Sequence, residues 1–149
     1  MDVYFLRHGD AADSGERPLS PKGRRQAQTA GEWLKARYIG PDAILCSPLL
    51  RARETAEIVG KILGVTPSVE TLLDSGAHLD DISDLVQDFA PDDTVILVGH
   101  EPDFSRAIAG LIGGGKIDVG KASVAWVACK RVRSGDGELR WLVPNELMG

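Results

Sequence analysis

The sequence has few of the residues that stabilise very small or secreted proteins. Cysteine occurs only twice among 149 residues, as Cys46 and Cys129, and each lies in an apolar run of strand length. Two such cysteines exclude a disulfide framework and are typical of buried thiols in a reducing compartment. A chain of this length buries about 70% of its unfolded surface, so it needs neither a disulfide nor a metal to fold. We therefore expect one domain, residues 1–149.

Long apolar runs and an excess of positive charge are also absent. No run approaches the roughly 18 apolar residues of a membrane span, and no pattern typical of a secretory signal opens the sequence. The net charge is −5 and the isoelectric point about 5.1, whereas nucleic acids and anionic membranes bind a basic face. These absences favour a cytoplasmic protein with no nucleic-acid or membrane partner. Any anion must then be captured by a local cluster of cations.

Two helices are predicted in the first half of the chain. The first begins at Pro21 with Ser20 as its N-cap, and Gly40 ends it. Its buried face is predicted to hold Ala27, Ala30, Leu34 and Tyr38, which follow at helical spacing. The second helix is predicted to begin in the same way, with Ser47 as its N-cap, and to end near Gly64.

The remaining elements continue the alternation of strands and helices. Short apolar runs predict strands, and helical spacing predicts two more helices. The strands are expected at residues 3–6, 43–46, 94–98, 123–132 and 138–143, and the helices at 79–89 and 102–112. The last two strands predict an antiparallel hairpin. The fold class expected is α/β, a three-layer sandwich with a mainly parallel central sheet, helices on both faces and a C-terminal antiparallel hairpin.

Chemically versatile residues follow three of the predicted strands. The first strand ends in Leu6-Arg7-His8-Gly9, the second is followed by Ser47-Pro48-Leu49-Leu50-Arg51, and the third by Gly99-His100-Glu101. Open α/β sheets bind ligands beyond the carboxyl ends of their strands. We therefore expect His8, His100 and the two arginines to converge on one site.

In this order the motifs resemble those of the histidine phosphatase superfamily, and within it the short SixA-type phosphohistidine phosphatases. The resemblance implies that His8 is the residue that becomes phosphorylated. It also implies that Arg7 and Arg51 bind phosphate and that His100 is the second active-site histidine. The segment Glu16-Arg17-Pro18-Leu19-Ser20 resembles a further family segment, which adds Arg17 to the phosphate-binding residues.

The residue types themselves suit this chemistry. A neutral imidazole such as His8 is a good nucleophile near neutral pH. The planar fork of arginine holds two phosphate oxygens and stays charged. A metal site built from His8, His100 and Asp10 or Glu101 is disfavoured, because Arg7 and Arg51 would repel a cation; no metal or other cofactor is expected. A structural role remains the alternative for either histidine, and simple solvation for Arg17.

Two further side chains are predicted to lie outside the site. Two residues along a helix correspond to about 200° of rotation, so Arg53 is expected to point away from Arg51 into solvent. His78 precedes a predicted helix without a matching motif, and we expect it to be exposed.

The proton donor is the least defined part of the prediction. Asp74 is the nearest candidate in sequence order, whereas Asp10 and Glu101 follow the two histidines and are equally interpretable as helix-proximal or solvated carboxylates. The expected function is a metal-independent phosphatase that acts through a phosphohistidine at His8. Its expected substrate is phosphohistidine on a protein, such as a histidine-containing phosphotransfer domain. The alternatives are a small-molecule phosphomonoesterase or phosphomutase, and a non-catalytic phospho-binding regulator.

Overall fold

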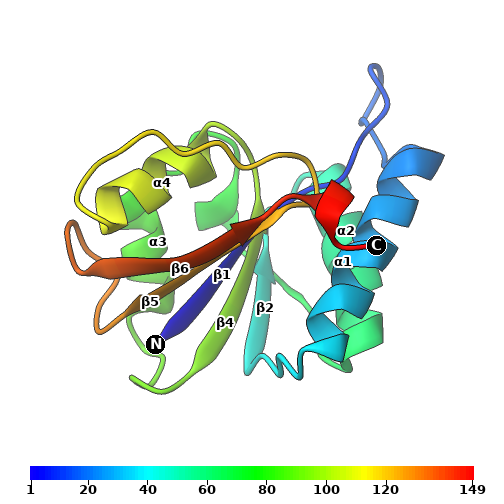
Figure 1. Cartoon of the computed structure of the whole chain (residues 1–149). Coiled ribbons are helices and arrows are strands. Elements are labelled where there is room, and N and C mark those ends of the chain that lie inside the picture. Colours follow the sequence, from blue (N-terminus) through cyan, green and yellow to red (C-terminus); the bar gives the residue numbers. More distant parts are fainter.

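One six-stranded sheet forms the centre of the computed structural model, which describes all 149 residues (Figure 1). Its strands are β1 (Asp2–Arg7), β2 (Ala43–Cys46), β3 (Ser68–Val69), β4 (Thr94–Gly99), β5 (Val124–Cys129) and β6 (Gly137–Val143). The order across the sheet is β3-β2-β4-β1-β5-β6. Strands β1 to β4 are parallel to one another. Strand β5 is antiparallel to β1, and β6 is antiparallel to β5. The predicted α/β class with a C-terminal antiparallel pair is confirmed.

Four α-helices cover the two faces of this sheet. They are α1 (Pro21–Ala36), α2 (Leu50–Leu63), α3 (Leu79–Val86) and α4 (Asp103–Leu111), with short 3-10 helices η1 (Thr71–Leu73) and η2 (Asn145–Leu147). Figure 1 shows α1 and α2 on one face and α3 and α4 on the other. None of the helices combines the length and the apolar character needed to cross a membrane.

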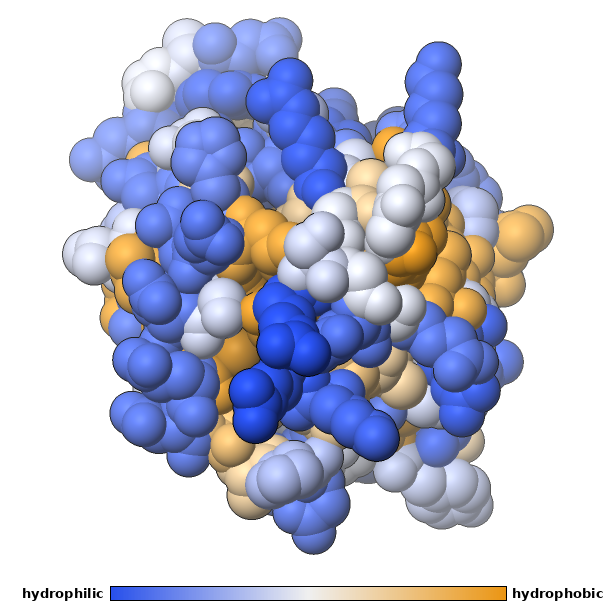
Figure 2. Space-filling view, turned by 90° about the vertical axis from the view of Figure 1, so that its left-hand side faces the viewer, coloured by the Kyte–Doolittle hydropathy of each residue, from blue (hydrophilic) through white to orange (hydrophobic).

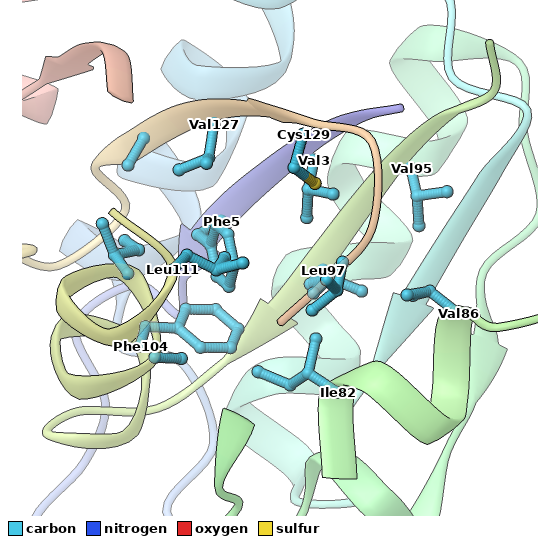
Figure 3. Packing of buried hydrophobic residues seen from close by; sticks show 14 of the residues in the cluster. Val3, Phe5, Ile82, Val86, Val95, Leu97, Phe104, Leu111, Val127 and Cys129 are labelled. Atoms are coloured by element: carbon cyan, nitrogen blue, oxygen red, sulfur yellow. The ribbon is translucent and has the colours of Figure 1, made fainter. Parts of the chain in front are cut away.

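The alternation of side chains along β1 divides the core into two layers. Val3 and Phe5 pack toward α3 and α4, whereas Tyr4 and Leu6 pack toward α1 and α2. In the first layer the ring of Phe5 meets that of Phe104 edge to face at a centroid distance of 5.2 Å (Figure 3). A central strand buried on both faces must be apolar at every position, which explains the unbroken apolar run in the sequence.

The start of α1 was predicted well and the start of α2 was not. Ser20 caps α1, because its Oγ accepts the Gly23 N–H at 3.0 Å. The prediction that Ser47 caps the second helix is wrong, since α2 begins at Leu50 and its N-cap position is Leu49. The Oγ of Ser47 instead accepts the Leu49 N–H within the preceding turn, at 3.2 Å.

The predicted inward position of Tyr38 is also wrong. Helix α1 ends at Ala36, and Tyr38 lies beyond it in a left-handed conformation with 96% of its surface exposed. The other predicted core residues of α1 are buried: Ala27, Ala30 and Leu34. Periodicity extended the helix too far because the reversal of the chain occurs before Gly40.

Smaller differences concern element ends. Helix α3 stops at Val86 rather than at Phe89, and β5 stops at Cys129 rather than at Val132. Both cysteines are buried and free, as expected. On the face that carries the N-terminus and the hairpin turn, apolar residues form only small patches among hydrophilic ones (Figure 2).

Candidate active site

Three strand ends meet at one edge of the sheet. Strands β1 and β4 are parallel neighbours with Arg7 opposite Gly99, so His8 and His100 leave the sheet side by side. The His8 N–H donates to the Gly99 carbonyl at 3.1 Å, and the two imidazole centroids are 5.3 Å apart. Strand β2, on the other side of β4, brings Ser47 to the same edge. The structure thus brings together the strand ends that the sequence predicts to converge.

Two glycines allow β1 to continue directly beside the start of α1. A Cβ on Gly9 would lie 2.7 Å from the Gly23 carbonyl oxygen, and a Cβ on Gly23 would overlap the Asp10 carbonyl. Real side chains do not tolerate such contacts, so only glycine fits at either position. This close approach fixes where the chain turns after His8.

The protonation of His8 is determined by a single hydrogen bond. Its Nδ1 lies 2.7 Å from the Gly9 carbonyl oxygen, which can only accept, so Nδ1 carries the proton. The pKa of His8 is lowered to about 4, mainly by burial; the Gly9 bond opposes this, and the nearby His100, Arg51 and Arg7 contribute to it. The imidazole is therefore neutral at pH 7, with an unprotonated Nε2 available to attack an electrophile.

His100 complements His8 with an unused nitrogen. Its Nε2 lies 2.7 Å from the Ser47 Oγ, and its Nδ1 is buried without a hydrogen-bond partner in the chain. Burial, followed by the charge of Arg51, lowers the pKa of His100 to about 4. If Ser47 donates to Nε2, the neutral ring carries its proton on Nδ1, which can then donate to a bound anion.

Arg7 and Arg51 contribute further unused donors. Arg7 is held by a hydrogen bond from Nη1 to the Val119 carbonyl at 3.1 Å, while its Nε is buried and unpaired. The Nε of Arg51 is also buried and unpaired. Burial lowers the pKa of Arg51, as does the charge of Arg17, while Asp74 opposes both. Buried donors are rarely left unsatisfied, so these groups together indicate a binding site for a tetrahedral anion.

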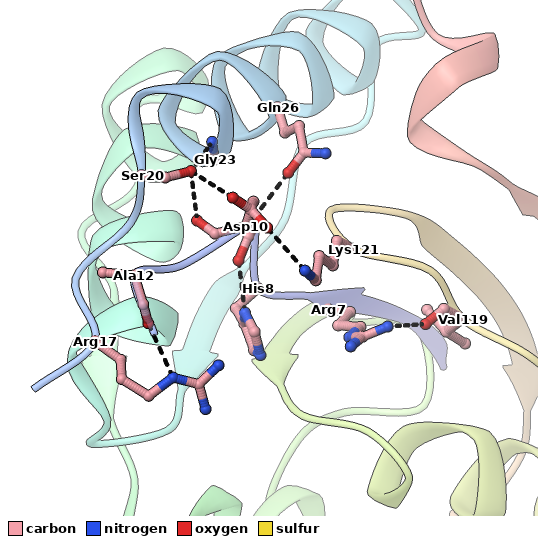
Figure 4. A network of polar contacts seen from close by, with 11 residues as sticks. Arg7, His8, Asp10, Ala12, Arg17, Ser20, Gly23, Gln26, Val119 and Lys121 are labelled. Atoms are coloured by element: carbon pink, nitrogen blue, oxygen red, sulfur yellow. Dashed lines mark hydrogen bonds and ion pairs between the residues drawn. The ribbon is translucent and has the colours of Figure 1, made fainter. Parts of the chain in front are cut away.

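Arg17 approaches the site from the loop before α1. Its Nε donates to the Ala12 carbonyl at 3.1 Å, and its backbone is left-handed, with φ of 54°. In Figure 4 Arg17 and Arg7 lie on opposite sides of the His8 ring. Arg17 is exposed, yet its charge reaches Arg51, which is consistent with the phosphate-binding role implied by the resemblance.

Arg53 does not lie freely in solvent as predicted. Its side chain is partly buried, with a buried and unpaired Nε, and its positive charge acts on the thiol of Cys46. Arg53 thus lies close enough to the end of β2 for its charge to act on Cys46. His78 is exposed, as predicted.

The three candidate acids differ in what they already bind. Asp10 accepts from Lys121 at 2.8 Å and from the Ser20 hydroxyl at 2.7 Å (Figure 4), and both bonds lower the pKa of its carboxyl. Both carboxylate oxygens of Glu101 are bound by Ser105. These two acids therefore have structural partners.

Asp74 differs from both, because it is exposed and the only hydrogen bond of its carboxylate is from the neighbouring Ser75 N–H, at 2.7 Å. Its charge reaches both Arg51 and His100 and raises the pKa of each. Of the three carboxylates, Asp74 is thus the one that is bound only by its neighbour and whose charge acts on two residues of the site.

Sequence reasoning missed the residues that hold these groups in place. The Thr55 hydroxyl accepts the Gly9 N–H at 3.1 Å and donates to the Arg51 carbonyl at 2.8 Å, so it ties the exit of β1 to α2. A polar Thr on the apolar stripe between Ala52 and Ala56 was the available signal. No three His, Cys, Asp or Glu side chains come together as metal ligands.

Comparison with known proteins identifies the family. The model of the histidine phosphatase superfamily (branch 1) matches residues 3–76. An uncharacterized protein of Picosynechococcus sp. is 35% identical over 99% of this chain and 93% of its own length. The phosphohistidine phosphatase SixA of Escherichia coli is 38% identical over 48% of this chain and 47% of its own length. A solved structure of the protein histidine phosphatase SixA complexed with tungstate is 27% identical, with a TM-score of 0.88 and complete coverage of both chains.

The chain belongs to the histidine phosphatase superfamily. Its fold and its matches are those of the SixA type within that superfamily. Histidine phosphatases among its curated relatives also include probable phosphoglycerate mutases. A phosphatase- or mutase-type reaction on a phosphorylated substrate is therefore the function that this membership supports.

Proposed function

We propose that the protein removes the phosphoryl group from a phosphohistidine of another protein and carries it transiently on His8. The observation that supports this most is the fixed tautomer of His8. Its Nδ1 proton is bound to Gly9, which leaves Nε2 as the nucleophile beside unpaired nitrogen atoms of Arg7, Arg51 and His100. The tungstate in the similar SixA structure is a tetrahedral oxyanion of the same shape as phosphate.

The reaction takes place in two transfers. The Nε2 lone pair of His8 forms a bond to phosphorus while the substrate P–N bond breaks, and the departing imidazole takes up a proton. Water then attacks phosphorus, loses its proton, and displaces His8 with its lone pair restored, which releases inorganic phosphate. Arg7, Arg17, Arg51 and His100 stabilise the charge on the equatorial oxygens in both steps.

The absence of a covering cap favours a macromolecular substrate. The chain between α2 and β4 forms only β3, η1 and the eight-residue α3, so no large cap covers the strand ends. Arg17 and Asp74 at the rim are both exposed. A side chain on a second protein, such as a histidine-containing phosphotransfer domain, can reach His8 from this side. We propose a cytoplasmic location, where the buried free thiols Cys46 and Cys129 remain reduced.

We also propose that the reaction needs no metal ion, because guanidinium groups supply the positive charge that a metal would otherwise provide. Excess EDTA is expected to leave the rate unchanged. Loss of activity with EDTA that a divalent metal restores would contradict this part of the proposal.

One observation favours a second function. Asp74 lies near Arg51 and His100, where an acid could protonate an alcohol leaving group. Probable phosphoglycerate mutases are among the relatives. Hydrolysis of small phosphate esters is therefore the alternative that the same site could support.

A substrate panel tests the proposal. Turnover of a phosphohistidine peptide or phosphorylated histidine domain is compared with that of phosphoserine, phosphotyrosine, sugar phosphates and phosphoglycerates. We expect phosphohistidine to be fastest and His8→Ala to lose at least about 10⁴-fold in rate, as removal of a catalytic nucleophile does.

His78→Ala is the matched control, because His78 is an exposed histidine outside the site, and circular dichroism checks the fold of both variants. Faster turnover of an ester would favour the alternative function. Near-normal activity of His8→Ala would overturn the mechanism.

A further inference from the structure

A second hollow lies at the opposite end of the sheet from His8. Its volume is about 480 Å³, within the range of about 300–1,000 Å³ that is typical of small-molecule sites. It is lined by residues at the start of β4 and just after the end of α1, and these two ends lie at the bottom of Figure 1. The six residues of β4 separate Thr94 in this hollow from His100 by about 20 Å, given the rise per residue of a strand. The hollow is thus distinct from the phosphate site.

The walls of this hollow are unusually aromatic for a chain with 5% aromatic residues. Tyr4 and Trp126 stack with their planes 11° apart and their centroids 5.7 Å apart. Trp141 packs against both of these rings, and all three residues line the hollow. A ligand with a planar ring would find a π-surface there on which to stack.

The lip of the hollow is formed by a residue whose conformation favours glycine. Tyr38 follows α1 with φ of 58°, and its N–H bonds the Lys35 carbonyl while the Ile39 N–H bonds the Leu34 carbonyl. This is a Schellman motif, whose left-handed position glycine fills most readily. Packing within the chain does not compensate, because the Tyr38 side chain is 96% exposed. A strained aromatic residue with no partner in the chain points to a partner outside it.

The hydroxyl of Tyr4 adds a polar group to this aromatic wall. Tyr4 is only 6% exposed, and its phenol makes no hydrogen bond within the chain although it lines the hollow. Burial and then the charge of Asp2 raise its pKa to about 12. The phenol is therefore protonated near pH 7 and can donate a hydrogen bond to water or to a ligand.

The charge at the rim indicates the sign of that ligand. The Arg37 guanidinium lies 3.8 Å from the Trp33 ring centroid and donates from Nη1 to the Trp33 carbonyl at 3.3 Å. It makes no ion pair with an acid, and it lines the hollow together with the aromatic residues. We propose that this hollow binds a small planar aromatic anion of the size of a nucleoside monophosphate, with its ring between Tyr38 and the tryptophans and its anionic group at Arg37.

Intrinsic fluorescence tests this directly, because all three tryptophans lie in or next to the hollow. The whole protein is titrated with AMP, with adenosine, which lacks the charge, and with ribose 5-phosphate, which lacks the ring. We expect a saturable change with AMP, a weaker one with adenosine and none with ribose 5-phosphate. The AMP response should persist in Arg51→Ala, in which the distant phosphate site is impaired. Absence of a saturable AMP response, or its loss in Arg51→Ala, would overturn the proposal.

Three variants separate binding from folding. Tyr38→Gly should weaken AMP binding at least about fivefold, the lower end of the effect of losing one stacking partner, while Tm stays the same or rises. Tyr38→Phe should bind like the wild type, and Arg37→Gln should weaken AMP but not adenosine. Undiminished binding in Tyr38→Gly would contradict the proposal. Fluorescence that changes with protein concentration in the absence of any ligand would also contradict the proposal, because a second copy of the chain would then cover the hollow.

Discussion

Two sets of polar groups flank His8, and they differ in whether they are paired. On the α1 side, Asp10 binds Lys121, Ser20 and the Gln26 amide oxygen, so its carboxylate, its carbonyl and its N–H all have partners. On the opposite side, Arg7, Arg51 and His100 each keep a buried nitrogen unpaired. The same short stretch of chain supplies members of both sets.

This difference separates groups that hold the backbone in place from groups that can bind a phosphoryl group. A paired group helps to fix the position of the backbone. Its removal lowers stability by the free energy of its hydrogen bonds. An unpaired buried donor adds nothing to folding and is retained at a cost in desolvation. We therefore expect substitutions in the unpaired set to affect catalysis, and substitutions in the paired set to affect stability.

The largest contrast is expected between Arg51 and Arg53. Arg51→Ala removes a transition-state donor from a buried site and should lower the rate about 10²- to 10³-fold. Arg53 also has a buried, unpaired Nε, but its charge acts on Cys46 and not on either histidine, so Arg53→Ala should cost less than about tenfold. Steady-state rates of both variants on one substrate decide this, with circular dichroism as the control. Equal losses would show that Arg53 also contacts the phosphoryl group.

The next effect concerns the proton donor and depends on the leaving group. An imidazole with a pKa near 6.5 departs readily, whereas an alcohol needs a proton from an acid. Asp74→Asn should therefore slow the cleavage of a phosphate ester about 10²-fold and that of phosphohistidine by less than about tenfold. Single-turnover rates on matched peptides measure the contrast. Equal effects on both substrates would show that Asp74 is not the proton donor to the leaving group.

A stability effect follows from the two buried histidines. Burial lowers the pKa of His8 and His100 to about 4, whereas the unfolded chain binds these protons near pH 6.5. Between these values the unfolded state takes up more protons, so stability falls as pH decreases and is fully present only above about 6.5. Urea unfolding at pH 7 and pH 5 should show a loss of about 2 kcal/mol for each histidine.

His8→Ala should lose less stability over this range than the wild type, and His78→Ala should lose as much. If His8→Ala and the wild type had the same pH dependence, His8 would not be the source of the effect.

The smallest effect is expected in the paired set. Lys121→Ala breaks a partly exposed ion pair with Asp10, and such pairs contribute about 0–1 kcal/mol. We expect a small decrease in Tm and an almost unchanged rate. A rate loss as large as that of Arg51→Ala would mean that the paired set also takes part in catalysis.

Much of the fold follows from the spacing of apolar residues and from the residues that begin and end helices. The unbroken apolar run of β1 and the Ser20-Pro21 cap were sufficient to place a buried strand and the start of α1. Ser47 was misplaced because its hydroxyl bonds the distant His100 as well as Leu49 in the preceding turn. Tyr38 was misplaced because the left-handed residue that follows α1 is a tyrosine, where glycine would have given a signal in the sequence.

The site was predictable where it follows strand ends. His8 and His100 were located because the register of parallel strands brings their successors together. The pairing state of each side chain was not predictable, because it depends on residues distant in sequence. Asp10 bonds Lys121, which is 111 positions away in the sequence, and Arg7 bonds Val119, which is 112 positions away. Asp74 was distinguished from the other acids only by such pairing.

The most direct test of the account is the identity of the phosphorylated atom. The enzyme is mixed with a phosphohistidine substrate and quenched in alkali, in which phosphohistidine is stable. Mass spectrometry then locates the modified residue, and phosphorus NMR distinguishes its two ring nitrogens. Because Nδ1 of His8 donates to the Gly9 carbonyl, the account predicts one phosphoryl group on His8, bonded to Nε2. A phosphoryl group on Nδ1 or on another residue, or turnover without any phosphoenzyme, would contradict it.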